Sequence, residues 1–178
     1  LDDDPNRFLP TDSDVYQVED LILAQKILQN ELAKDKEPAA YLRILLGEVY
    51  YLSGEYEVAL KLYSQLISEE KNHPETLDYK WRIFAGLGLV NVQLEDIESG
   101  ITMLQEASQL NRNHLGIKQK IAETYIKADL FNQAYSKAEE IFESGSTDTK
   151  NLFWYANFMA KLNNQQGEIK GYEQIIHF

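Results

Sequence analysis

The chain has 178 residues, of which 44% are hydrophobic, as expected of a folded domain with a sizeable core. It contains no cysteine, which excludes disulfides, thiolate metal sites and cysteine nucleophiles. The net charge of -12 argues against a nucleic-acid partner, and the absence of an apolar run of ~18 residues argues against membrane insertion by this segment.

The N-terminal part of the sequence is acidic. Residues 1-13 hold three consecutive aspartates and two prolines, which predict an irregular arm. Residues 14-36 form one predicted amphipathic helix, because apolar side chains recur at three- and four-residue steps from Val15 to Leu32. We expect this helix to cover the open end of the units that follow. Residues 115-178 are nearly balanced in charge, so they would tolerate an anionic partner that residues 1-39 would repel.

A recognisable pattern begins after Pro38, where Leu46-Gly47-Glu48-Val49-Tyr50 is followed by Ala59 and Tyr63. Small residues at Gly47 and Ala59 allow two antiparallel helices to approach, while larger apolar side chains fill the space between them. The pattern resembles the tetratricopeptide repeat (TPR), a helix-turn-helix unit of 34 residues. Small residues recur at the same place with spacings of 41, 34 and 34, at Gly47, Gly88, Ala122 and Ala156.

The resemblance implies an all-α fold, a right-handed α-solenoid of TPR units with an extra N-terminal helix. It covers residues 40-178, with repeats at about 40-73, 81-114, 115-148 and 149-178. The fourth unit is the least regular, because Glu168 takes a small position and Gly171 weakens the second helix, while Tyr172 takes a core position. Gly86 has two interpretations: a cost in helix stability, or room for a ligand backbone.

The sequence predicts no catalytic residue, no metal site and no cofactor. Neither His73 nor His114 has a second ligand at helical spacing. Gly86-Leu87-Gly88 lacks the third glycine and the preceding strand of a dinucleotide site. The acidic clusters at residues 95-98 and 139-143 are typical of solvated helix surfaces. We therefore expect that the chain is not an enzyme.

In TPR proteins the first helix of each unit lines a concave groove, so the resemblance implies a partner-binding surface. The implied residues are aromatic and apolar towards the N-terminus and include lysines towards the other end, which suits an extended peptide or an amphipathic helix. They are Tyr41, Ile44, Glu48, Tyr51, Arg82, Leu89, Gln119, Glu123, Lys127, Lys150, Phe153, Trp154, Asn157 and Lys161. In the alternative interpretation, the N-terminal helix or neighbouring repeats bury several of these aromatic residues.

One known TPR binding mode can be tested on the residues. The carboxylate clamp of chaperone-binding TPR domains requires a set of lysine, asparagine and arginine residues on consecutive first helices. The corresponding places hold Ile44, Glu48, Gly86, Gly116 and Lys120 in one register, and the next register fails as well. The carboxyl termini of heat-shock proteins are therefore not expected ligands.

Three functions remain open at this point. The first is a non-catalytic protein-protein interaction module, a scaffold or assembly factor that binds a protein or peptide partner in the groove. The second is a structural or self-associating segment of a longer TPR solenoid, with the apolar end at residues 175-178 as the surface for self-association. The third is the regulatory arm of an enzyme outside this segment. The chain starts at Leu1 rather than Met, so we expect a longer parent protein, and the localisation stays unknown.

Overall fold

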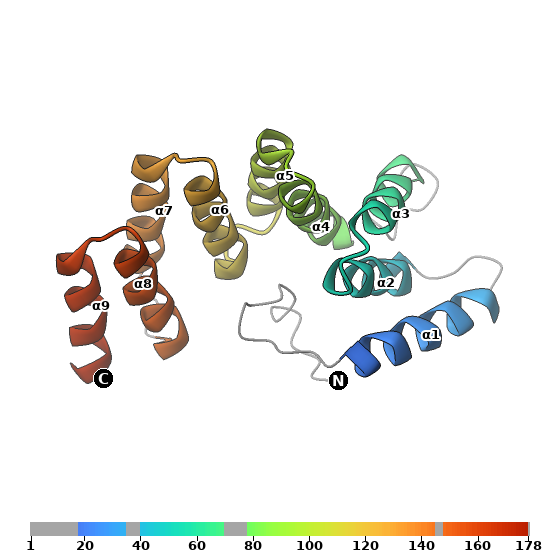
Figure 1. Ribbon diagram of the computed structural model, residues 1–178, viewed down its shortest axis with the longest axis horizontal. Coiled ribbons are helices and arrows are strands. Elements are labelled where there is room, and N and C mark those ends of the chain that lie inside the picture. Colours follow the sequence, from blue (N-terminus) through green and yellow to red (C-terminus); the bar gives the residue numbers. More distant parts are fainter. Residues whose placement is uncertain (1–17, 35–39, 70–77, 145–147, 178) are drawn as a thin grey trace. The chain divides into compact units, whose positions relative to one another are not determined.

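The computed structural model describes residues 18–34, 40–69, 78–144 and 148–177, and within them it contains nine α-helices and no strand (Figure 1). The predicted arm at 1-13, both ends of the predicted helix 14-36, and His73 lie outside the described residues. The helices are α1 (Val18–Lys34), α2 (Ala40–Leu52), α3 (Tyr56–Glu69), α4 (Lys80–Gln93), α5 (Ile97–Leu110), α6 (Leu115–Lys127), α7 (Phe131–Glu143), α8 (Thr149–Lys161) and α9 (Gln165–His177).

Four short turns with the same geometry join α2 to α3, α4 to α5, α6 to α7 and α8 to α9. In the first, the Glu55 N–H donates to the Tyr50 carbonyl at 2.8 Å across one left-handed residue, the Schellman ending of a helix. The left-handed residues are Gly54 (φ 78), Glu95 (φ 67), Asp129 (φ 57) and Asn163 (φ 54). Their spacings are 41, 34 and 34, the same as those of the small residues in the sequence pattern.

The chain divides into two compact units, unit 1 (Leu1–Ile117) and unit 2 (Lys118–Phe178), with the boundary in the first turn of α6. In unit 1, α1 packs along α2, and the Gln29 side-chain amide donates to the Tyr50 hydroxyl at 3.0 Å. Tyr50 follows Glu48 by two residues, so the two side chains point to nearly opposite sides of α2. Helix α1 therefore contacts the side of α2 that lies away from Glu48.

The core of unit 1 is built around Tyr63, whose side chain is 1% exposed. Its ring lies between Gly47 on α2 and Gly86 on α4. A Cβ atom at Gly47 would lie 2.7 Å from the ring, and one at Gly86 would lie 2.4 Å from it. Burial raises the pKa of the Tyr63 hydroxyl well above its usual range. The two glycines thus provide the space that the ring fills.

A buried ion pair joins the same two helices. Arg82 on α4 donates to Glu48 on α2 at 2.9 Å, and each side chain is 8% exposed. Burial raises the pKa of the Glu48 carboxyl, and the Arg82 guanidinium opposes this shift without cancelling it. The guanidinium also lies 5.3 Å from the centre of the Tyr41 ring. Because both charges are desolvated, removing only one partner would leave the other charge buried without compensation and would strongly destabilise the fold.

In unit 2, two glycines bring α9 close to α8. A Cβ at Gly167 would lie 2.7 Å from Met159, and one at Gly171 would lie 2.8 Å from Ala156. Because Gly171 faces α8, the next residue, Tyr172, turns outward and is 36% exposed. The prediction that Tyr172 lies in the core is therefore wrong. The residues of α9 that pack closely against α8 are Gly167 and Gly171, and not Glu168 and Tyr172.

A polar cluster also connects α9 to the rest of unit 2. Tyr155 on α8 donates a hydrogen bond to Glu139 on α7, and Lys170 on α9 donates to the same carboxylate at 3.0 Å. Partial burial opposes ionisation of Glu139, but these hydrogen bonds outweigh it and lower its pKa. Lys170 also lies 4.2 Å from the centre of the Phe142 ring. Three helices therefore share one charged cluster.

The packing of Tyr63 predicts the effect of Gly86→Ala. In an exposed helix this change stabilises by roughly 1 kcal/mol, but here the new methyl group would overlap a ring that is closed in on both sides. We expect unfolding in urea to show a loss of about 1–3 kcal/mol. Combining the change with Tyr63→Leu should recover part of this loss. A stabilised Gly86→Ala protein would show instead that the glycine only weakens its helix.

The buried ion pair predicts strong coupling between its partners. Glu48→Leu leaves the Arg82 guanidinium buried without its carboxylate, and we expect a loss of about 3 kcal/mol in the free energy of unfolding. The double change Glu48→Leu with Arg82→Met should be clearly more stable than Glu48→Leu alone. Equilibrium unfolding of the wild type, both single variants and the double variant measures the coupling, and additive effects would contradict it.

Candidate partner-binding surfaces

Most of the predicted groove residues of unit 1 are buried. Ile44 is 0% exposed and Leu89 is 7% exposed, so both belong to the core. Glu48 and Arg82 are occupied by their mutual ion pair. Tyr41, at 39% exposed, and the half-buried Tyr51 are the members of the predicted set that reach the surface of this unit.

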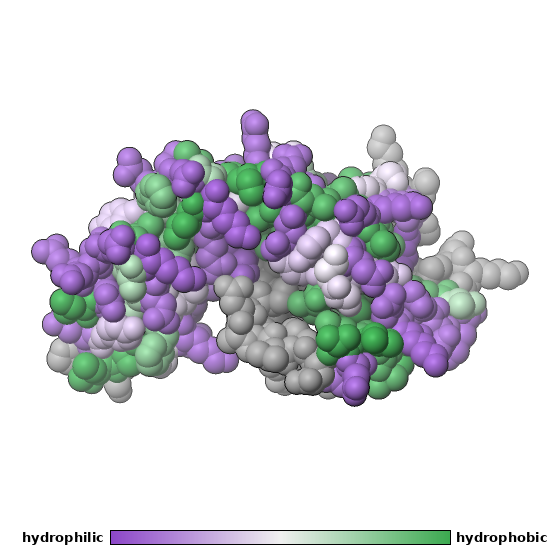
Figure 2. Space-filling view, viewed as in Figure 1, coloured by the Kyte–Doolittle hydropathy of each residue, from purple (hydrophilic) through white to green (hydrophobic). Residues whose placement is uncertain are grey.

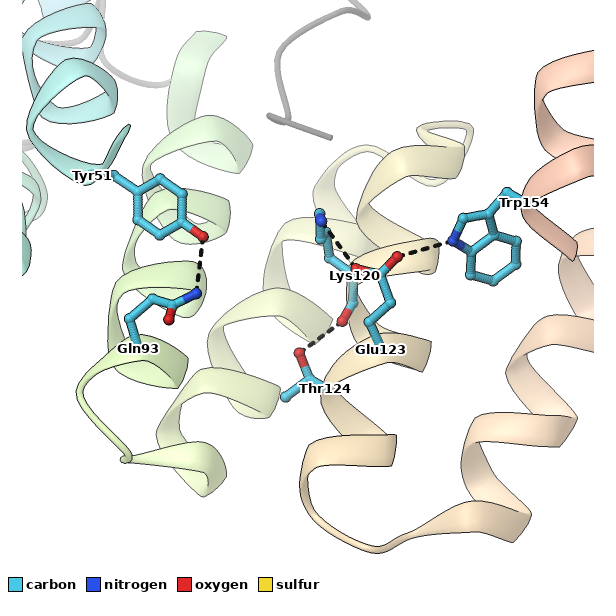
Figure 3. Close-up of polar contacts among 6 residues, drawn as sticks. All are labelled: Tyr51, Gln93, Lys120, Glu123, Thr124 and Trp154. Carbon is cyan, nitrogen blue, oxygen red and sulfur yellow. Dashed lines mark hydrogen bonds and ion pairs between the residues drawn. The ribbon is translucent and has the colours of Figure 1, made fainter. Parts of the chain in front are cut away.

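The two surface tyrosines contact neighbours outside α2. The Tyr51 hydroxyl accepts a hydrogen bond from the Gln93 side chain at 3.3 Å (Figure 3), and its ring lies 5.7 Å from that of Tyr56. The Tyr41 ring lies 5.5 Å from that of Tyr79. Unit 1 therefore presents two separate aromatic pairs, Tyr41 with Tyr79 near the start of α2 and Tyr51 with Tyr56 near its end.

In unit 2, the predicted residues of α6 and α8 are brought together. The Gln119 side-chain amide donates to Asn151 at 2.9 Å, and the Trp154 indole N–H donates to Glu123 at 3.0 Å (Figure 3). Both pairs advance in the same direction along the chain, so the two helices run parallel. Asn151 was not among the predicted residues, although its place one turn before Trp154 puts it beside α6.

Trp154 is fixed at its edge and at its face. Its indole N–H binds Glu123, whose other carboxylate oxygen accepts from Lys120 at 2.9 Å, and its ring stacks on Phe158 at 4.8 Å. The side chain is half-buried, so part of the ring stays accessible. A ring held in this way loses little conformational entropy when a ligand packs on it.

Lysines lie on the same sides of α6 and α8 as Trp154 and its partner Glu123. Glu123 and Lys127 follow Gln119 at four-residue steps on α6, while Lys150, Trp154, Asn157 and Lys161 follow one another at steps of four, three and four on α8. Lys127, Lys150 and Lys161 are exposed, and Lys120 is half-buried. The name α6–α8 face is used below for these eight residues: Gln119, Lys120, Glu123, Lys127, Lys150, Trp154, Asn157 and Lys161. The face carries four lysines and one glutamate, in a chain whose net charge is -12.

Phe153 and Asn157 adjoin α9 rather than α6. The Tyr172 hydroxyl donates to the Asn157 side chain at 3.3 Å, and the Phe153 ring lies 6.3 Å from the Tyr172 ring. Phe153 is 45% exposed. Asn157 thus marks the border of the α6–α8 face, and Phe153 belongs to a separate apolar surface.

The described part of the chain offers no group of three His, Asp or Glu side chains placed to hold a metal ion. His114 is buried against Trp81 with a ring separation of 4.9 Å, and its Nδ1 accepts from the Ile117 N–H at 3.3 Å, as a residue that caps α6 does. Among the helices described, none is long and apolar enough to cross a membrane.

No family model matches the sequence, and no curated protein sequence matches it. Solved structures do resemble it. MamA has a TM-score of 0.63 and 14% identity, covering 89% of this chain and 88% of MamA. PilF of Pseudomonas aeruginosa has a TM-score of 0.60 and 18% identity, covering 89% of this chain and 72% of PilF.

A third similar structure is that of YrrB, described as a TPR protein with an unusual peptide-binding site. Its TM-score is 0.55 with 19% identity, covering 90% of this chain and 78% of YrrB. Sequence identities this low establish the fold alone. Together with the repeated helix hairpins and their left-handed turn residues, they confirm the predicted fold class: this chain has the all-helical TPR fold.

Proposed function

We propose that this chain is a non-catalytic protein-interaction module and that its α6–α8 face binds an acidic segment of a partner protein. The observation that carries the proposal is the fixed, half-buried Trp154, with Lys120, Lys127, Lys150 and Lys161 on the same sides of α6 and α8. YrrB, which shares the fold, has a peptide-binding site, so a peptide ligand suits this architecture.

The charge of the ligand follows from the charge of the face. Four lysines against one carboxylate favour an anionic segment, and the acidic remainder of the chain disfavours its binding elsewhere. Lys120 is engaged with Glu123, which leaves Lys127, Lys150 and Lys161 as the exposed cations on this face. Their ammonium groups can move towards carboxylates of a bound segment, because long side chains on a helix surface keep their charged ends in water.

The shape of the ligand follows from the helices. The two parallel helices are joined by hydrogen bonds from Gln119 to Asn151 and from Trp154 to Glu123. Each of the two helices is 13 residues long, so together they offer a surface of that length to a ligand. An apolar side chain of the ligand would pack on the indole ring, and flanking acids would meet the lysines. Such spaced recognition suits an extended peptide or one face of a helix.

The lysine face predicts charge-selective binding. An acidic peptide with a central leucine or phenylalanine should bind the protein, and Lys150→Gln with Lys161→Gln should weaken that binding about tenfold, because each exposed ion pair contributes up to about 1 kcal/mol. Fluorescence anisotropy of the labelled peptide, measured at two salt concentrations, gives the dissociation constants. Higher salt should weaken binding to the wild type more than to the double variant.

Controls separate this face from general charge effects. Lys34→Gln with Lys61→Gln removes two exposed lysines from α1 and α3 and should leave the affinity unchanged. A basic peptide of the same length should not bind. Equal weakening by both pairs of substitutions, or equal affinity for the basic peptide, would rule out the α6–α8 face as the binding site.

A further inference from the structure

Glu123 is the only acidic residue in the sequences of α6 and α8. The two helices carry five lysines, three on α6 and two on α8, whereas the whole chain has 29 acidic residues and 17 basic ones. On the side of unit 2 drawn in Figure 2, hydrophilic residues cover most of the surface, with smaller apolar areas between them. Charge therefore distinguishes these two helices from the rest of the chain, and a single carboxylate lies among their lysines.

Both carboxylate oxygens of Glu123 are engaged, and each contacts a different side chain. Its Oε1 accepts a hydrogen bond from the Trp154 indole N–H at 3.0 Å, and its Oε2 accepts one from the Lys120 ammonium group at 2.9 Å (Figure 3). The first contact connects α6 to α8, and the second lies within α6. The same residue therefore holds the indole ring and neutralises one lysine of the α6–α8 face.

The Lys120–Glu123 ion pair is partly accessible to solvent. The Glu123 side chain is 25% exposed, and the Lys120 side chain is 15% exposed. Partly buried charges are screened less by salt than fully exposed ones, so the loss of either partner would change the local charge that a ligand meets. Because the pair as a whole is neutral, an acidic ligand gains little from Lys120 while Glu123 holds it.

Two acidic residues that neighbour these helices have other contacts. Asp148 precedes α8 as its N-cap and accepts a hydrogen bond from the Lys150 backbone N–H at 3.0 Å. Glu140 of α7 forms an ion pair at 3.2 Å with Lys118, a lysine of α6 that is not part of the α6–α8 face. Glu123 is therefore the acid whose contacts fall within this face.

We propose that Glu123 sets the affinity of the α6–α8 face for acidic ligands through two separable contacts. One oxygen fixes the indole ring on which an apolar side chain of the ligand packs. The other oxygen withholds the Lys120 ammonium group from the carboxylates of the ligand. The role of Glu123 rests on the binding function proposed above for this face. Glu123 is thus a specificity-determining residue that supports the apolar contact and limits the attraction for acidic groups.

The variant Glu123→Gln separates the two contacts. A glutamine side chain keeps an oxygen that can accept from the indole N–H, but it has no negative charge to hold Lys120. The acidic peptide with a central leucine should bind this variant about fivefold more tightly than the wild type, the effect of one partly exposed charge pair. Fluorescence anisotropy at two salt concentrations should also show a steeper salt dependence, because one more cation takes part in binding.

A second acidic peptide, with alanine in place of the central leucine, tests the contact with the indole ring. The ratio of the two dissociation constants measures how strongly the protein selects the apolar side chain. Glu123→Gln should leave this ratio unchanged, because the ring keeps its hydrogen-bond acceptor. Glu123→Ala removes the acceptor as well and should bring the ratio closer to one. An unchanged ratio in Glu123→Ala would overturn the role of the indole contact.

Two further variants locate the charge effect. Lys120→Gln combined with Glu123→Gln should restore the wild-type affinity, because the loss of one positive charge offsets the loss of one negative charge. As a matched control, Glu140→Gln removes the carboxylate of another lysine–glutamate pair with three-residue spacing, Lys137–Glu140 on α7, and should leave the affinity unchanged.

The possible failures are distinguishable. If the wild type binds the leucine peptide but Glu123→Gln binds it no more tightly, the role of Glu123 is overturned and the binding function stands. A gain that persists without Lys120, or an equal gain in Glu140→Gln, would also overturn this role. If neither the wild type nor any variant binds either peptide, the binding function itself fails, and the role of Glu123 fails with it.

Discussion

The packing of unit 1 depends on one aromatic ring held between two backbones. Tyr63 comes from α3, yet it contacts Gly47 of α2 and Gly86 of α4, so it sets the separation of all three helices. With α2 and α4 held side by side, Arg82 reaches Glu48, and Gln93 reaches Tyr51. A single close-packed contact therefore holds together the helices that carry a buried ion pair and the Tyr51–Gln93 hydrogen bond.

Unit 2 reaches the same kind of helix pairing by a different distribution of side-chain volume. Its large residues Tyr155 and Met159 come from the first helix of the last pair, and its small residues Gly167 and Gly171 come from the second. This exchange releases Tyr172 from the core and leaves it on the outer side of α9. The exposure of Tyr172 thus results from how the interior of unit 2 is filled.

Local signals in the sequence predicted the helices well. The small residues of the repeat are a property of short stretches, and the left-handed turn residues from Gly54 to Asn163 recur with the same spacings of 41, 34 and 34. What the pattern could not reveal depends on contacts between distant residues. Gly86 provides space for the Tyr63 ring, and this contact cannot be seen in the sequence around Gly86. The orientation of α9 depends on which of its residues face α8, and periodicity alone does not show this.

The same distinction applies to the surfaces. The resemblance predicted Lys127, Lys150 and Lys161 for the groove, and helical spacing places Lys150 and Lys161 on one side of α8 with Trp154. The burial of Ile44 and Leu89 could not be predicted, because it depends on how closely the neighbouring helices pack. Glu48 and Arg82 were both predicted to face a groove, and only the structure brings them together as partners.

The two tryptophans of the chain fall in different units and in different surroundings. Trp81 lies against His114 in unit 1, and Trp154 donates to Glu123 in unit 2. In repeat proteins, neighbouring units can unfold separately when the interface between them is weak. Replacing either tryptophan with phenylalanine leaves tryptophan fluorescence, which can be excited separately from that of tyrosine, in the other unit alone. The chain therefore carries its own pair of optical probes for whether its halves melt together.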